Sequence, residues 1–161
     1  YLFLITDAFS RKIIGYHLSQ SLKASGCLAA LNKAIKEREY PERDLIHHSD
    51  RGIQYCCDAY VELLQKSQIN ISMTQSGSPY DNAIAERVNG ILKVEFNLYQ
   101  TFDSYSAAVE PVCKSIVAYN HIRPHYSCDL QTPQLTHSRE SGNTPKVFSD
   151  DYKQYCKVKT V

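Results

Sequence analysis

The stretch LIHHSDRG at residues 45–52 places the carboxylate of Asp50 at the end of a short apolar run, which predicts a buried strand. Gly52 then permits a tight turn. A second stretch, SPYDNAIAERVNGILK at residues 78–93, carries Glu86 about one turn into a predicted helix. A carboxylate at a strand end and another on a helix can converge on one divalent metal ion.

The predicted helix around Glu86 has recognisable start residues and two faces. Ser78 and Asp81 are candidate N-caps, and Pro79 suits a first helical position. Polar side chains recur at i, i+3 and i+7, which aligns Glu86, Asn89 and Lys93 along one stripe. The apolar stripe consists of Ala85, Val88, Leu92 and Phe96. A solvated helix face is the alternative interpretation for any one of these charged residues.

Several ordered motifs share a resemblance. The first runs from His48 through Asp50 to Tyr55, and the second from Ser76 to Glu86. Thirty-five residues lie between Asp50 and Glu86. Further motifs are Asp7-x-Phe9-Ser10-Arg11-Lys12-Ile13-Ile14-Gly15, Tyr119-Asn120-x-x-Arg123-Pro124-His125 and Thr132-Pro133. Together they resemble the catalytic core of bacterial insertion-sequence transposases of the DDE group, whose fold is shared with retroviral integrases. The resemblance runs from Tyr1 to about His137.

This resemblance implies an α/β ribonuclease H-like fold, with a mixed central sheet flanked by helices. In the family, the first catalytic Asp lies on a strand upstream of the position that matches Tyr1. We therefore expect this chain to lack that first strand and one catalytic carboxylate. Asp7 matches a turn residue and is the weaker candidate for a catalytic role. A missing strand would also expose a sheet edge, which invites pairing.

The resemblance implies two-metal phosphoryl transfer with Mg²⁺ or Mn²⁺. Asp50 and Glu86 would be the catalytic metal ligands, and Lys93 with Asn89 would position the DNA end. Further phosphate contacts are expected from Arg51, Arg87, Arg123 and His125. The implied partners are transposon ends and target DNA, together with further copies of the chain in a homodimer or higher homo-oligomer.

Two alternatives stay open at this point. The chain could be a catalytically inactive, truncated transposase remnant that keeps only the fold and a DNA or dimer surface. Another nuclease of the same fold is a weaker alternative, because the spacing of the carboxylates and Lys93 argue against it.

Composition limits the classes of protein that fit. A chain of 161 residues with 43% hydrophobic content can bury one core, which predicts one domain. The resemblance implies an N-terminally truncated catalytic core at residues 1–137 and a C-terminal tail at 138–161. No apolar run reaches the length of a membrane span and no signal peptide is visible, so a cytoplasmic protein is expected. The resemblance to bacterial transposases implies that it is associated with the nucleoid. A net charge of +1 means that DNA binding would need a local basic patch. Six cysteines without a CxxC pair or zinc spacing indicate free thiols.

Hydrophobic periodicity predicts the remaining elements. We expect strands at residues 1–6, 13–17 and 69–73, and helices at residues 22–38, 58–66 and 103–120. Asp58 and Asp103 are candidate N-caps, and Pro111 predicts a late start or a kink in the last helix.

Overall fold

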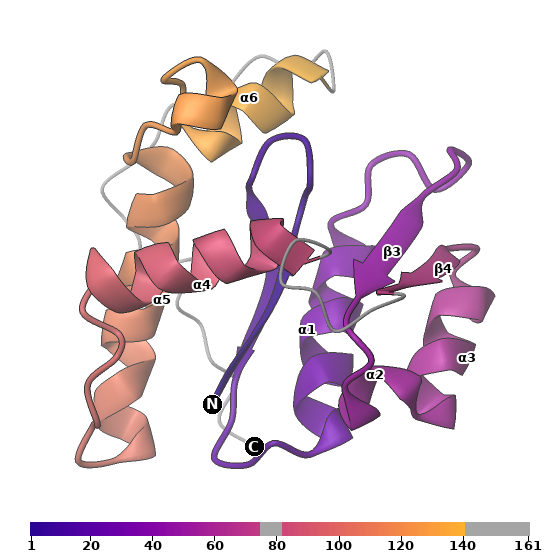
Figure 1. The fold of residues 1–161 in the computed structure, drawn as a ribbon, viewed down its shortest axis with the longest axis horizontal. Coiled ribbons are helices and arrows are strands. Elements are labelled where there is room, and N and C mark those ends of the chain that lie inside the picture. The colour runs from indigo at the N-terminus through magenta and orange to yellow at the C-terminus, as the bar shows by residue number, and fades with distance from the viewer. Residues whose placement is uncertain (75–81, 141–161) are drawn as a thin grey trace. The chain divides into compact units, whose positions relative to one another are not determined.

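The computed structural model describes residues 1–74 and 82–140. The chain divides into two compact units. The N-terminal unit comprises Tyr1–Thr6 and Ile14–Arg87, and the C-terminal unit comprises Asp7–Ile13 and the chain from Val88 onward. Figure 1 shows the elements of both units along the chain. The expected N-caps Ser78 and Asp81 and the expected helix start at Pro79 lie outside the described residues.

The first two strands form a hairpin. β1 (Leu2–Thr6) and β2 (Ile13–Leu18) are neighbours in a two-stranded sheet. The backbone N–H of Ser19 donates to the Tyr1 carbonyl at 2.8 Å, and that of Asp7 donates to the Lys12 carbonyl at 2.8 Å. These bonds join the two strands at their open end and at their turn.

The second pair of strands is parallel. β3 (Ile46–Ser49) and β4 (Asn70–Met73) run from the pair Ile46↔Asn70 to the pair Ser49↔Met73. Two helices connect them, α2 (Ile53–Cys56) and α3 (Asp58–Lys66), which makes a βαβ unit. The strands of the described residues form two pairs, β1 with β2 and β3 with β4. The expectation that β3 is buried is wrong for Ile46, which is 65% exposed, because β3 has a strand partner on one side only.

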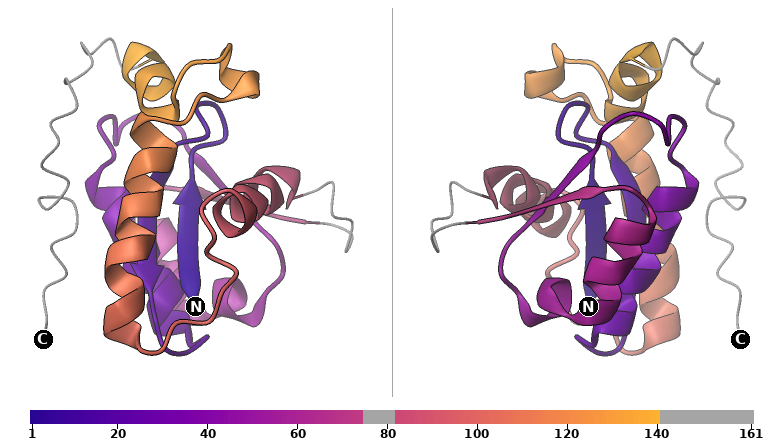
Figure 2. Two further views of the ribbon diagram at one scale, coloured as in Figure 1. Left: turned by 90° about the vertical axis from the view of Figure 1, so that its left-hand side faces the viewer. Right: turned by 90° about the vertical axis from the view of Figure 1, so that its right-hand side faces the viewer.

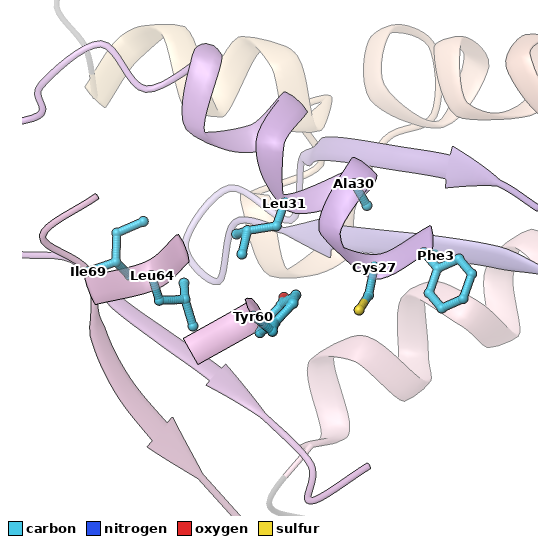
Figure 3. Packing of buried hydrophobic residues seen from close by; sticks show 7 residues of the cluster. All are labelled: Phe3, Cys27, Ala30, Leu31, Tyr60, Leu64 and Ile69. Atoms are coloured by element: carbon cyan, nitrogen blue, oxygen red, sulfur yellow. The ribbon is translucent and has the colours of Figure 1, made fainter. Parts of the chain in front are cut away.

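The N-terminal unit is built around α1 (Ala24–Lys36). Its buried cluster, drawn in Figure 3, joins β1, α1 and α3 and consists of Phe3, Cys27, Ala30, Leu31, Tyr60, Leu64 and Ile69. Gly26 allows the β1 ring of Phe3 to approach, since an added Cβ would lie 2.3 Å from it. Each large side chain buried here contributes about 1.5–3 kcal/mol to stability.

Two expected N-caps are wrong by one residue. Asp58 is the first residue of α3, and Cys57 occupies the N-cap position without a side-chain cap bond. Asp58 therefore lies in the first turn, where a negative charge favours the helix dipole. In α5 (Tyr105–His121), Ser104 replaces Asp103 as the cap, and its hydroxyl accepts from the Ala107 N–H at 3.1 Å.

The C-terminal unit contains the longest helix, α5, which runs through Pro111 as one helix from Tyr105 to His121 (Figure 2). A short 3₁₀ turn, η2 (Tyr126–Cys128), follows, and then α6 (Pro133–Glu140). The first three residues of the expected tail, Ser138 to Glu140, belong to α6. The rest of the expected tail, residues 141–161, lies outside the described residues.

α4 (Ala83–Val94) joins the two units along the chain and carries Glu86 in its first turn. Val88, Ile91 and Leu92 are buried, while Ala85 and Phe96 of the predicted apolar stripe are only half-buried. No helix within the described ranges is long and apolar enough to cross a membrane. Cys27, Cys56, Cys57 and Cys128 are free thiols as expected, whereas Cys113 is in a disulfide.

Candidate active site

Asp50 lies where the parallel strands β3 and β4 end. β3 ends at Ser49, and the ladder continues with a bond from the Thr74 N–H to the Ser49 carbonyl at 3.1 Å. Asp50 is exposed, and its Oδ1 accepts from the Gly52 N–H at 2.8 Å. A Cβ on Gly52 would lie 2.9 Å from that same oxygen, so a glycine is needed for this turn. The turn holds the carboxylate at the carboxyl end of the parallel pair.

The neighbours of Asp50 fix its turn. The Nε of Arg51 donates to the Thr74 carbonyl at 2.8 Å, which ties the turn to the end of β4. Burial raises the pKa of the Tyr55 phenol, and the negative charge of Asp50 raises it further. The buried Ser49 hydroxyl has no hydrogen-bond partner among the described residues. The hydrogen bond from Arg51 to Thr74 thus uses the Nε of the guanidinium.

Glu86 belongs to the same unit as Asp50 and is exposed in the first turn of α4. Both residues are thus accessible hard oxygen donors, the type that Mg²⁺ and Mn²⁺ prefer. No group of three or more His, Cys, Asp and Glu side chains in residues 1–74 and 82–140 is placed to hold a metal ion. The donor chemistry of Asp50 and Glu86 fits a divalent ion, and their role as metal ligands stays a prediction.

Three further predicted DNA contacts lie on α4. Arg87, Asn89 and Lys93 are all exposed. Glu86, Asn89 and Lys93 have the spacing that aligns side chains along one helix face. Their exposure leaves them accessible to a ligand as large as DNA.

Arg123 is engaged within the C-terminal unit. Its Nε and Nη2 donate to the two carboxylate oxygens of Glu95 at 2.6 and 2.7 Å, and its Nη1 donates to the Pro124 carbonyl at 3.0 Å. The hydrogen bond to Glu95 raises the pKa of Arg123, more than burial lowers it. The side chain is 19% exposed. This guanidinium holds the segment after α5 in place.

His125, another expected phosphate contact, is buried in the C-terminal unit. The residue is 6% exposed, its Nε2 lies 3.1 Å from the Tyr119 hydroxyl, and its Nδ1 lies 3.4 Å from the Ser127 hydroxyl. The two rings meet edge to face, with centroids 5.6 Å apart. The structure therefore places the His125 ring among residues of its own unit, and its contact with a phosphate stays a prediction.

Asp7 caps the turn of the first hairpin. Its Oδ2 accepts from the Ser10 N–H at 2.8 Å and from the Ser10 hydroxyl at 2.5 Å, and it lies 3.5 Å from Nδ1 of His137. Burial alone would raise the pKa of Asp7, but the hydrogen bonds from His137 and Ser10 outweigh it and hold the pKa well below its usual range. The Asp7 carboxylate therefore stabilises the turn through its bonds to Ser10 and its contact with His137.

The same turn has partners that the sequence analysis missed. The side-chain amide of Asn120 accepts from the Ile13 N–H at 2.9 Å and donates to the Ile13 carbonyl at 3.0 Å. The Tyr119 hydroxyl donates to the Arg11 carbonyl at 2.9 Å. We call residues 7–13 with Tyr119, Asn120 and His137 the turn clamp. Tyr119 and Asn120 stand in a quoted motif, but nothing in the sequence indicated that the motif contacts residues more than one hundred positions earlier.

Comparisons with known proteins show the family of this chain. Family models described as the integrase core domain match residues 1–79 and 67–133. The transposase for insertion sequence element IS904 of Lactococcus lactis is 33% identical over 135 residues, 83% of this chain and 53% of that protein. Transposase InsF for insertion sequence IS3A of Escherichia coli is 35% identical over 135 residues, 83% of this chain and 46% of that protein. The chain spans about half the length of these relatives.

Solved structures show the fold. The HTLV-2 integrase catalytic core domain in complex with magnesium matches with a TM-score of 0.62 and 18% identity, over 82% of this chain and 80% of that chain. A chain of the simian T-cell lymphotropic virus intasome matches with a TM-score of 0.68 and 19% identity, over 92% of this chain and 50% of that chain. The fold is therefore the α/β, ribonuclease H-like fold of retroviral integrase cores, as expected.

Proposed function

Because the chain belongs to the integrase core domain family of insertion-sequence transposases, we propose that it forms a transposase catalytic core, which cleaves DNA and joins a 3′-hydroxyl end to a target strand. The observation that carries this proposal is the exposed Asp50 at the carboxyl ends of β3 and β4, in the motif that resembles the family's catalytic core. The comparisons give no reason to prefer an inactive remnant.

Asp50 and Glu86 would hold a divalent ion, either Mg²⁺ or Mn²⁺. Both carboxylates are exposed and belong to one unit, and the related HTLV-2 core was solved with magnesium. An ion bound there supplies positive charge that neutralises the phosphate and favours ionisation of the attacking hydroxyl. The turn at Gly52 fixes the direction of the Asp50 carboxylate before any ligand arrives, which lowers the cost of binding.

DNA would be bound by the exposed cations and the amide of α4. Lys93 and Arg87 would neutralise backbone phosphates, and Asn89 would hydrogen-bond the DNA end. Arg51 would add a phosphate contact with the nitrogens that Thr74 does not use. Arg123 and His125 would act indirectly, because both are held by residues of their own unit. We assign them to the support of the fold and not to DNA contact.

The partners would be the transposon ends, target DNA and further copies of the chain. The HTLV-2 core was solved in dimeric and trimeric forms, and joining two DNA ends to one target suits a homodimer or larger assembly. The place of action would be the bacterial nucleoid.

A strand-transfer assay with the full natural protein tests this function. Labelled duplexes carrying the ends of the encoding element should be cut and joined to target DNA when Mg²⁺ is present, and EDTA should abolish joining. Glu86→Gln should lower the joining rate by about 10³-fold or more, since it removes a metal ligand. Glu62→Gln is the matched control, because Glu62 is also exposed but pairs with Lys66 on α3. Joining that survives EDTA or Glu86→Gln would refute the proposed function.

A further inference from the structure

Two thiols of the N-terminal unit converge on one carbonyl oxygen. The Cys27 thiol on α1 has two acceptors, the Ala24 carbonyl at 3.0 Å and the Gln54 carbonyl at 3.4 Å. Cys57 at the N-cap of α3 directs its Sγ at the same Gln54 oxygen, 3.2 Å away. The two sulfur atoms are therefore neighbours, although twenty-nine residues lie between them in the chain. They belong to elements that also contact each other, since α1 packs against both α2 and α3.

The two thiols differ in their access to solvent. Cys27 is 1% exposed and lies in the cluster of Figure 3, where its side chain points from α1 into the buried interior. Cys57 is half-buried, so a small reagent can reach it first. Neither thiol has a role in the proposed phosphoryl transfer. A reachable thiol beside a buried one is the arrangement of a redox-sensitive pair, in which the second thiol resolves the oxidation of the first.

We propose that Cys27 and Cys57 are a modification site, which closes to an intramolecular disulfide when the protein meets a low-molecular-weight disulfide such as oxidised glutathione. The Cys57 thiol loses its proton and attacks one glutathione sulfur, and the glutathione S–S bond breaks to release one glutathione. Cys27 then loses its proton and attacks the Cys57 sulfur, which releases the second glutathione. Two protein thiols are oxidised, and one disulfide is reduced to two thiols.

The chemistry of Cys27 fixes the order of these steps. Burial raises the pKa of the Cys27 thiol, and the proximity of Cys57 raises it further, so little thiolate is present for attack on a dissolved reagent. The second step is intramolecular, and the resulting high effective concentration compensates for a small thiolate fraction.

The crosslink has a consequence for α2. Both thiol hydrogen bonds to the Gln54 carbonyl are lost, because a disulfide has no S–H donor. α2 begins directly after the turn of Asp50 and Gly52, so oxidation alters the segment beside the candidate active site. Formation of the disulfide depends only on the thiols and not on a catalytic role of Asp50.

Peptide mapping of the folded protein tests the site. The protein is incubated with oxidised glutathione, alkylated, digested with trypsin and measured by mass spectrometry. We expect a Cys27–Cys57 crosslink in the wild type and in Cys56→Ser, and its loss on treatment with dithiothreitol. In Cys57→Ser, Cys27 should remain a free thiol that is alkylated only after denaturation.

Cys56→Ser is the decisive control, because Cys56 is the exposed neighbour and its thiol is directed at the Met73 sulfur, 3.9 Å away. Accumulation of Cys57 as a glutathione mixed disulfide while Cys27 stays free would overturn the proposal. A Cys56–Cys57 linkage in place of the expected crosslink, or no crosslink in Cys56→Ser, would overturn it too. The wild-type map is direct evidence even if Cys57→Ser folds poorly.

Discussion

Two turns of this protein follow a strand and begin with an aspartate, yet they hold their carboxylates in opposite ways. After β1, Asp7 accepts two hydrogen bonds from Ser10 and lies beside His137. After β3, Asp50 accepts from the Gly52 N–H and is exposed. The pattern of strand, aspartate and turn is therefore compatible with a structural carboxylate and with a catalytic one. The partners of the carboxylate distinguish the two.

The two turns also differ in how many hydrogen bonds the surrounding residues make to them. In the turn clamp, side chains hydrogen-bond to the backbone of residues 7–13. The Asn120 side chain bonds to both the N–H and the carbonyl of Ile13, as the backbone of a neighbouring strand would. The turn after β3 is held by the Gly52 N–H and by Arg51, which leaves the carboxylate accessible. A turn whose polar groups are hydrogen-bonded within the protein is suited to stabilising the fold. A turn with an accessible carboxylate is suited to binding a ligand.

The largest expected effect comes from exchanging one carboxylate for an amide in each turn. Asp50→Asn should lower the strand-transfer rate of the full natural protein by about 10³-fold or more and change the free energy of unfolding by less than about 0.5 kcal/mol. The amide oxygen can still accept from the Gly52 N–H, but it is a poor metal ligand. Asp7→Asn should leave the rate of the folded protein near the wild-type value. Loss of joining in Asp7→Asn with unchanged stability would instead make Asp7 the catalytic residue.

A large loss of stability is expected when a hydrogen-bonding side chain of the turn clamp is removed. Asn120→Ala leaves the N–H and the carbonyl of Ile13 without their side-chain partners in a buried place, which should cost about 2–4 kcal/mol. Asn89→Ala is the matched control, since Asn89 is exposed on α4 and alanine favours helix, so its effect should stay within about 0.5 kcal/mol. Urea unfolding measures both. Equal stability of the two variants would show that the clamp does not support the fold.

Local patterns predicted the elements of this chain well. The spacing of apolar residues located the helix from 24 to 36 and the strand before Asp50, and Gly52 marked the turn. The positions of helix caps were less accurate, because adjacent polar residues such as Asp103 and Ser104 are equally good candidates until the backbone is known.

Contacts between distant segments could not be predicted in the same way. The pairing of Asn120 with Ile13 spans more than one hundred residues, and no periodicity encodes it. The burial of His125 follows from the ring of Tyr119, and a histidine next to an arginine and a proline reads equally well as a phosphate contact. The exposure of Ile46 depends on which strands are paired beside it, and this is a property of the fold rather than of its segment.

The lowered pKa of Asp7 predicts a loss of stability in acid. A carboxylate whose pKa is lower in the folded state than its unfolded value of about 3.9 adds stability that is fully present above that pH and is lost as the pH falls toward the folded pKa. Asp7→Asn should cost about 1–2 kcal/mol at pH 7 and flatten the stability profile below about pH 4. Ser10→Ala should give part of this effect. An unchanged acid profile in Asp7→Asn would contradict the strong bonding of this carboxylate.

The smallest effect is expected from a comparison of two cationic side chains, one exposed and one bound within the protein. Lys93 is exposed on α4, whereas the Arg123 guanidinium is bound to both oxygens of Glu95. Lys93→Ala should weaken DNA-end binding by about 1 kcal/mol and reduce the slope of log affinity against log salt by about 1, because one phosphate contact and its released counterion are lost. Arg123→Ala should lower stability and leave that slope unchanged, and Lys66→Ala, far along the chain on α3, should change neither. Fluorescence anisotropy over a salt series separates these outcomes, and a reduced slope in Arg123→Ala alone would show that the internally held cation, and not the exposed one, contacts DNA.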